Sequence, residues 1–239
     1  MSENNKYHSI ILGVCLVIGL ALLGSLIGNA LIRFKQFERT VTVKGLSERE
    51  YEADIVIWPI QFTVAGNDLG EMYHSIDKSS ERIRTFLEKA GIDREEITVS
   101  TPAVFDRSAQ QYGSDSSPGF RFVASQTVTV YSGHIATVRK VMSELSELGK
   151  QGIVLTGENY ESQTEYIFTR LNEVKPEMIE EATRQAREVA EKFASDSKSR
   201  LGKIKSASQG QFSISSRDKN NPHIKNIRVV STISYYLSD

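Results

Sequence analysis

The stretch “YEADIVIWPIQFTVAG”, residues 51–66, decides the fold of this 239-residue chain. Every second residue from 56 to 64 is apolar, and these five side chains share one face: Val56, Trp58, Ile60, Phe62 and Val64. A period of two predicts a long strand with one buried face. Pro59 has no N–H to donate to a neighbouring strand, so we expect this strand to lie at a sheet edge or to be bulged there.

A helix is predicted directly after this strand. Asp68 and Glu71 have capping-box spacing, and apolar residues then follow a helical period up to Gly91. The segments after it are predicted, in order, as a strand (95–106), a polar hairpin loop (107–119), a strand (120–131), a helix (135–149) and further strand (152–168). This order is that of a ferredoxin-like βαββαβ core, in which helices cover one face of an antiparallel sheet.

The C-terminal part predicts a third helix and two strands. Pro176 is placed as a first-turn residue of a helix that runs to Leu201. The strands follow at 205–213 and 226–237, and the last one looks exposed enough to pair edge to edge with another chain. A short strand that ends at Gly45 precedes the opening stretch. We therefore expect an α+β fold with one compact domain over residues 40–239, two packed lobes being the alternative.

Residues 10–32 carry no charged side chain. As a helix, these roughly 23 residues would reach about 34 Å, which is enough to cross a bilayer. A cleavable signal has a shorter apolar core, of about 7–15 residues, and ends in small residues such as those at 28–30. We expect a retained transmembrane anchor or uncleaved signal at 10–32, with a cleaved signal as the alternative. Residues 1–9 would then form a cytoplasmic tail, and 33–39 a juxtamembrane segment.

The flanking charges leave the orientation of this helix open. Lys6 precedes it and Arg33, Lys35 and Arg39 follow it, but long exported domains translocate largely regardless of such charges. Small residues four apart along the helix predict a face that packs against a second membrane helix: Gly24 and Gly28, with Ala21 and Ser25 beside them. The alternative is that glycine is simply common in membrane helices.

Neither the composition nor any motif of the sequence indicates a catalytic or ligand-binding site. A formal net charge of −1, from 29 basic and 30 acidic residues, argues against nucleic-acid binding through bulk charge. The single cysteine, Cys15, excludes an intrachain disulfide and a cysteine-rich metal site. The histidines have no metal-ligand spacing, and each is expected to be an ordinary surface or cap-adjacent residue and not a ligand: His8, His74, His134 and His223. The sequence therefore predicts no catalytic residue, no cofactor and no metal, and we expect a protein that is not an enzyme.

Three stretches of the chain are typical of one family: “VTVKGLSEREYEADIVIWPIQFTV” (41–64), “IEEATRQAREVAEKFASDSKSRLGKIKSASQG” (179–210) and “IRVVSTISYYLSD” (227–239). Together they resemble the SIMPL-domain family of YggE-like cell-envelope proteins. The chain resembles a divergent member, because Ala53 stands where the family usually has proline before Asp54. From its place in the sequence, Asp54 is expected to be an ordinary strand-entry residue, the alternative being a buried carboxylate with a role.

The resemblance implies an α+β domain that lies in the bacterial envelope, outside the cytoplasmic membrane. It marks six structural positions and carries over no catalytic residue: Gly45, Asp54, Ala182, Ala186, Ala190 and Gly202. It also implies a link to stress and, for some members, ring-like oligomers.

The function expected from these observations is that of a single-pass protein of the cytoplasmic (inner) membrane. Its periplasmic or extracytoplasmic domain would act without catalysis, as a homo-oligomeric scaffold or as a module that docks an envelope protein partner. One alternative is an accessory subunit of a larger membrane complex, which would use the transmembrane helix as its contact. The other is an enzyme or small-ligand module whose polar residues converge only in three dimensions.

Overall fold

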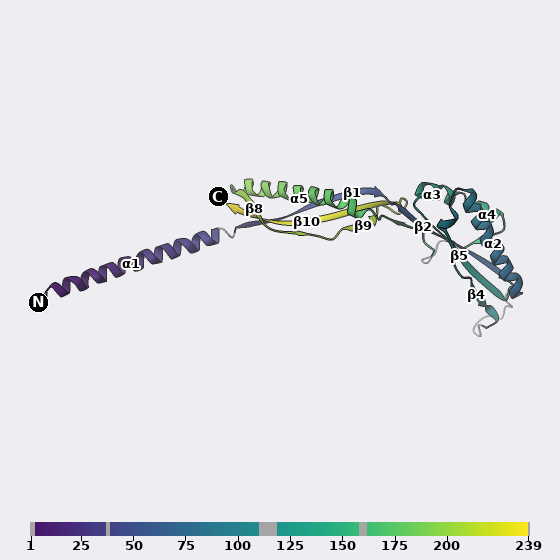
Figure 1. Ribbon diagram of the computed structural model, residues 1–239, viewed down its shortest axis with the longest axis horizontal. Coiled ribbons are helices and arrows are strands. Elements are labelled where there is room, and N and C mark those ends of the chain that lie inside the picture. The colour runs from purple at the N-terminus through teal and green to yellow at the C-terminus, as the bar shows by residue number, and fades with distance from the viewer. Residues whose placement is uncertain (1–2, 37–38, 110–118, 158–161, 239) are drawn as a thin grey trace. The chain divides into compact units, whose positions relative to one another are not determined.

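The computed structural model describes residues 3–36, 39–109, 119–157 and 162–238 (Figure 1). The chain forms two compact units of helices and antiparallel sheet, so the predicted α+β class is confirmed. Unit 1 comprises residues 1–48, 175–212 and 228–239, and unit 2 comprises residues 49–174 and 213–227.

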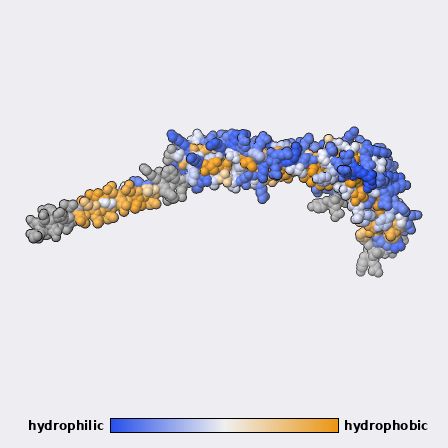
Figure 2. Space-filling view, in the orientation of Figure 1, coloured by the Kyte–Doolittle hydropathy of each residue, from blue (hydrophilic) through white to orange (hydrophobic). Residues whose placement is uncertain are grey.

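The N-terminal helix, α1 (Glu3–Gln36), contains the predicted apolar segment. Its stretch Leu12–Leu31 is long and apolar enough to cross a membrane, and none of that stretch is buried within the described chain. Figure 2 shows hydrophobic surface along this helix. Length and composition fit a membrane anchor, and a signal sequence near the N-terminus would pass the same test.

The sheet of unit 1 has the strand order β1 (Thr40–Glu52), β10 (Ile224–Ser238), β8 (Arg200–Gln209) (Figure 1). β10 and β8 are antiparallel, with Ile233 opposite Ala207. The last strand therefore lies in the middle, and the prediction that it is an exposed edge is wrong. In the described part of unit 1, β1 and β8 are the strands at the edges.

Helix α5 (Leu171–Asp196) supplies the helical side of the unit 1 core. Its buried alanines pack with side chains of β1 and β10: Ala186 and Ala190 against Val43, Ile233 and Tyr235. Because the helix begins at Leu171, Pro176 lies inside it, and its placement in the first turn is wrong. The helix ends before the predicted Leu201, and Lys198 then adopts a left-handed backbone conformation with φ of 54°.

The sheet of unit 2 has the strand order β3–β5–β2–β6, while β4 also pairs with β5 and β7 with β2. All of these neighbours are antiparallel. The bounds are β2 (Ile55–Gly66), β3 (Ile97–Val99), β4 (Ala103–Asp106), β5 (Phe122–Ser132), β6 (Val154–Leu155) and β7 (Glu165–Ile167). The predicted strand at 95–106 is thus two short strands, β3 and β4. Most of the predicted loop, residues 110–118, lies outside the described residues.

Helices α2 (Leu69–Lys89), α3 (Ile135–Ser143) and α4 (Ser146–Lys150) complete unit 2, with two short 3-10 turns at Arg94–Glu96 and Arg107–Ala109. Asp68 caps α2 as predicted, because its side chain accepts a hydrogen bond from the Glu71 N–H. The single helix predicted over 135–149 is divided into α3 and α4. Strand β9 (Ser213–Ser216) pairs with β10.

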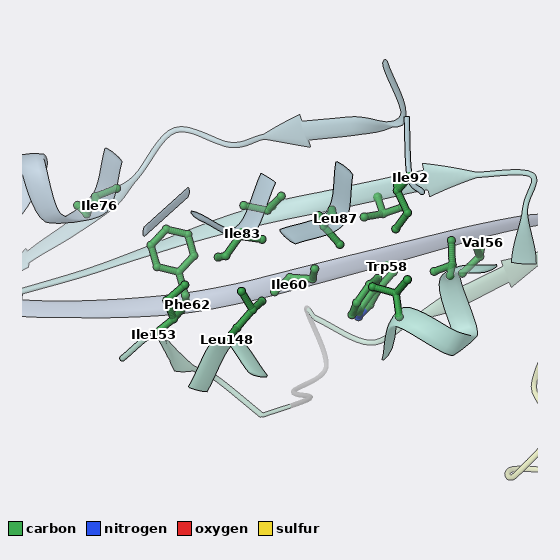
Figure 3. Close-up of a cluster of buried hydrophobic side chains, with 14 of the residues drawn as sticks. Val56, Trp58, Ile60, Phe62, Ile76, Ile83, Leu87, Ile92, Leu148 and Ile153 are labelled. Atoms are coloured by element: carbon green, nitrogen blue, oxygen red, sulfur yellow. The ribbon is translucent and has the colours of Figure 1, made fainter. Parts of the chain in front are cut away.

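The alternating face of the opening stretch forms the core of unit 2 as predicted. Trp58, Ile60 and Phe62 of β2 lie against residues of α2 and α4 (Figure 3). β2 is internal to the sheet, and its register with β5 passes Pro59 without a shift, so the predicted edge or bulge is wrong. On the other side of β2, β7 pairs with residues 55–57 and β6 with 62–63, so Pro59 lies in the interval between these ladders.

Candidate functional site

The residues predicted to pack membrane helices lie along the exposed α1. A Cβ atom added to Gly24 or Gly28 would meet nothing within 4 Å among the described residues. Ala21 and Ser25 are exposed beside them. No described part of this chain therefore covers the face, and a contact there would have to come from another helix.

Gly45 lies inside β1, which runs on to Glu52, so the prediction that the strand ends at this glycine is wrong. A Cβ at Gly45 would lie 1.8 Å from the Ala182 carbonyl oxygen and 2.6 Å from the Ala186 nitrogen. Only glycine fits at this position, because the backbones of β1 and α5 are in direct contact. On the helix side, this contact is lined by fully buried alanines. Gly202 has a milder version of this constraint, with its Cβ position 3.0 Å from the Tyr236 carbonyl oxygen.

Asp54 occupies the turn between β1 and β2 and ties it to the start of α5. Its carboxylate accepts hydrogen bonds from the Thr169 N–H at 2.9 Å and from the Arg170 N–H and Nε at 3.3 Å. Burial alone would raise the pKa of Asp54, but the hydrogen bonds from Thr169 and Arg170 outweigh it and hold that pKa below its usual value. All of its described hydrogen bonds come from Thr169 and Arg170, so the carboxylate fastens the β1–β2 turn to the segment before α5.

A polar hollow of about 700 Å³ lies in unit 2 and was not predicted. This volume falls within the usual range of small-molecule sites, roughly 300–1,000 Å³. Residues of α3, of the approach to β7 and of the β9–β10 connection line it, among them Arg139, Met142, Tyr166, Lys219 and His223.

His223 forms a hydrogen bond with Arg139 across this hollow, with 3.0 Å between Nη1 and Nε2. Because a guanidinium only donates, Nε2 accepts and the ring proton resides on Nδ1. Nδ1 is buried and has no hydrogen-bond partner in the described part of the chain. Burial and then the charge of Arg139 lower the pKa of His223, so the ring is neutral at pH 7. His223 is thus a half-buried side chain that is hydrogen-bonded to Arg139.

Some of the charged groups around the hollow have a partner of opposite charge, and others have none among the described residues. Asp218 accepts hydrogen bonds from Arg217 Nε at 2.8 Å and from the Asn221 N–H at 2.9 Å, and Arg217 above all lowers its pKa to about 2. Arg139 and Lys219 have no carboxylate partner among the described residues. Next to the hollow, buried Lys225 donates to Ser216 Oγ, and burial lowers its pKa.

The hollow has no signature in the sequence, because Arg139 and His223 are 84 residues apart. The only local signal is “RDKNNPH”, residues 217–223, whose polar residues and proline indicate a turn but no ligand. In the described residues, no group of three His, Cys, Asp or Glu side chains is placed to hold a metal ion.

Comparison with known protein families matches residues 41–228 to the SIMPL family (DUF541), described as proteins of unknown function. A search of curated proteins gave no match. The matched residues contain all of unit 2 and about half of unit 1, including Gly45, Asp54 and the buried alanines of α5. The chain is therefore a member of the SIMPL family.

Proposed function

We propose that this protein is anchored in the cytoplasmic membrane by α1 and presents units 1 and 2 on the extracytoplasmic side, as a non-enzymatic scaffold or interaction module. The observation that carries the anchor is the stretch Leu12–Leu31, which is long and apolar enough to cross a membrane and has none of its length buried within the described chain. Water does not solvate a helix of this kind well, so it needs lipid or another apolar surface. The link to envelope stress remains a prediction of the family resemblance.

Self-association is supported by the two edges of the unit 1 sheet. β8 is exposed along most of its length, and its backbone groups on the side away from β10 can pair with a further strand. Lys203 and Lys205 would repel each other in a β8–β8 contact. We therefore propose that β8 of one copy pairs with β1 of the next, a head-to-tail contact that builds rings or filaments.

Cysteine cross-linking of the full chain tests this arrangement. In a Cys15→Ser background, the double variant Lys44→Cys/Lys205→Cys places one thiol on each edge strand. Within one copy β10 separates these strands, which is too far for a disulfide. We expect mild oxidation to give a ladder of covalent multimers, while each single variant serves as the matched control and gives none. Monomers alone from the double variant would contradict the β8–β1 contact.

A separate experiment, proteinase K digestion of intact spheroplasts, tests on which side of the membrane units 1 and 2 lie. An extracytoplasmic domain is digested without lysis, leaving a fragment that contains α1. Protection until the membrane is broken would contradict the proposed side.

Unit 2 we interpret as a ferredoxin-like βαββαβ core. Its strand order β3–β5–β2–β6, its antiparallel neighbours and its helices after β2 and after β5 support this interpretation. A small-ligand role is the second candidate function, favoured by the hollow at His223.

A further inference from the structure

We propose that the hollow beside His223 binds a small organic anion, whose carboxylate or phosphate group contacts Arg139 and Lys219 and whose apolar part lies on Met142 and Tyr166. This site lies within unit 2 and does not depend on the proposed scaffold role.

The charge of the ligand follows from the unpaired cations. Among the charged side chains that line the hollow, Asp218 is paired with Arg217, which also contacts Glu50 at 3.5 Å, whereas Arg139 and Lys219 have no described carboxylate partner. The exposed Glu52 acts on His223 only through its charge and does not line the hollow. An incoming anion would therefore meet two cations that no carboxylate of the described residues contacts, and charge-assisted hydrogen bonds are the strongest available to it.

The guanidinium of Arg139 is held in place before any ligand arrives, and Lys219 is positioned through its backbone. The Nη1 group of Arg139 donates to the neutral His223, which orients the planar guanidinium and leaves its other N–H groups available for an oxyanion. Lys219 belongs to a turn in which the Asp218 carboxylate accepts from the N–H groups of Asn220 and Asn221. Such preorganisation lowers the entropic cost of binding.

The size and lining indicate an organic ligand. A volume of about 700 Å³ is many times that of a water molecule, roughly 30 Å³, and lies in the range of sites for small organic molecules. Met142 and Tyr166 lie together on one side, with 3.8 Å between the Tyr166 hydroxyl and the Met142 sulfur. Sulfur and aromatic ring offer an apolar body a polarisable surface.

Two probes of the same shape separate charge from apolar contact: benzoate, which is an anion, and benzamide, which is neutral. The full chain in detergent, labelled at histidine ¹³Cε1, gives one signal for each of its four histidines. The His223 signal is assigned by its loss in His223→Gln. We expect benzoate to shift this signal saturably and benzamide to leave it in place. Inorganic phosphate, which lacks the apolar body, should bind more weakly than benzoate.

Arg139→Gln should weaken benzoate binding by about tenfold or more, because it removes the central charge-assisted hydrogen bond. Lys219→Gln should weaken it less, since this ammonium is a flexible point charge. Arg94→Gln is the matched control: Arg94 is an exposed arginine of unit 2 paired loosely with Glu88, and its loss should leave binding unchanged.

Three results would overturn the assignment. They are equal shifts from benzoate and benzamide, no response to benzoate up to its solubility, or unweakened binding in both Arg139→Gln and Lys219→Gln. Because Lys219→Gln changes no described contact, it keeps the test valid if Arg139→Gln unfolds. The cross-linking experiment tests strand pairing in unit 1, whereas benzoate binding tests the hollow in unit 2. A negative result in one experiment therefore does not contradict the other proposal.

Discussion

A Cβ atom on Gly45 would lie 1.8 Å from the carbonyl oxygen of Ala182, well inside any permitted contact. The atoms it would strike belong to the backbone of α5 and cannot rotate away. β1 and α5 can therefore approach this closely only because residue 45 has no side chain. The small side chains of Ala182 and Ala186 allow the same close approach from the helix.

Gly45→Ala should therefore destabilise unit 1 by about 3 kcal/mol or more, at the upper end of the cost of overpacking a core. Urea unfolding of the full chain in detergent, followed by circular dichroism, measures the change. Gly66→Ala in β2 is the matched control, because its Cβ would meet its nearest atom, the Asp68 carbonyl oxygen, at an ordinary 3.8 Å. Equal stability of the two variants would show that β1 and α5 can separate at little cost.

Asp54→Asn should lower the stability of unit 2 by about 1–2 kcal/mol near neutral pH, because it removes a charge that the Thr169 and Arg170 donors hold. Asp68→Asn is the control, since asparagine caps a helix as well as aspartate does. If the two variants are equally stable, the carboxylate charge is not what fastens the turn.

Asp54 should also make the free energy of unfolding depend on pH in the acid range. The folded pKa of Asp54 lies below the unfolded value of 3.8. The stabilisation is therefore fully present above that value and is lost as pH falls through the lower folded pKa. Between about pH 6 and about pH 3, Asp54→Asn should lose less stability than the wild-type chain. Parallel losses would show that other carboxylates carry the acid sensitivity.

The local elements of unit 2 could be predicted from the sequence because their signals are local. The alternation from Val56 to Val64 and the cap at Asp68 depend on neighbouring residues alone, and both hold in the structure. Pro59 misled the prediction because a missing N–H is tolerated wherever neighbouring strands leave an interval, and only the register of β6 and β7 shows that interval.

The errors in unit 1 and at the candidate site have a common cause. Gly45 looks like a strand end in sequence, yet the need for glycine arises from α5, more than a hundred residues later. The last strand looks exposed because nothing in its own residues reveals that β1 and β8 flank it. His223 likewise acquires its environment from Arg139 on α3, which no spacing rule connects to it.

Arg139→Gln should raise the pKa of His223 toward its ordinary value, because it removes the second cause of the shift while leaving burial, the first, in place. A pH titration of the His223 ¹³Cε1 signal without ligand measures this, and Arg94→Gln should leave the titration where it is. An unchanged midpoint in Arg139→Gln would show that the guanidinium does not face the ring in solution.

Gly24→Leu/Gly28→Leu distinguishes the scaffold from an accessory subunit that binds through its membrane helix. A Cβ atom at either glycine would meet nothing within 4 Å among the described residues, so the double variant should leave the folding of both units unchanged. If oligomers form through β8 and β1, their mass in detergent, measured by light scattering, should also stay the same. Gly13→Leu/Gly19→Leu, whose Cβ positions are equally open, controls for added bulk in the helix. A mass that falls only in the Gly24/Gly28 variant would move assembly from the sheet edges to the membrane helix, because leucine blocks the close approach that small residues allow.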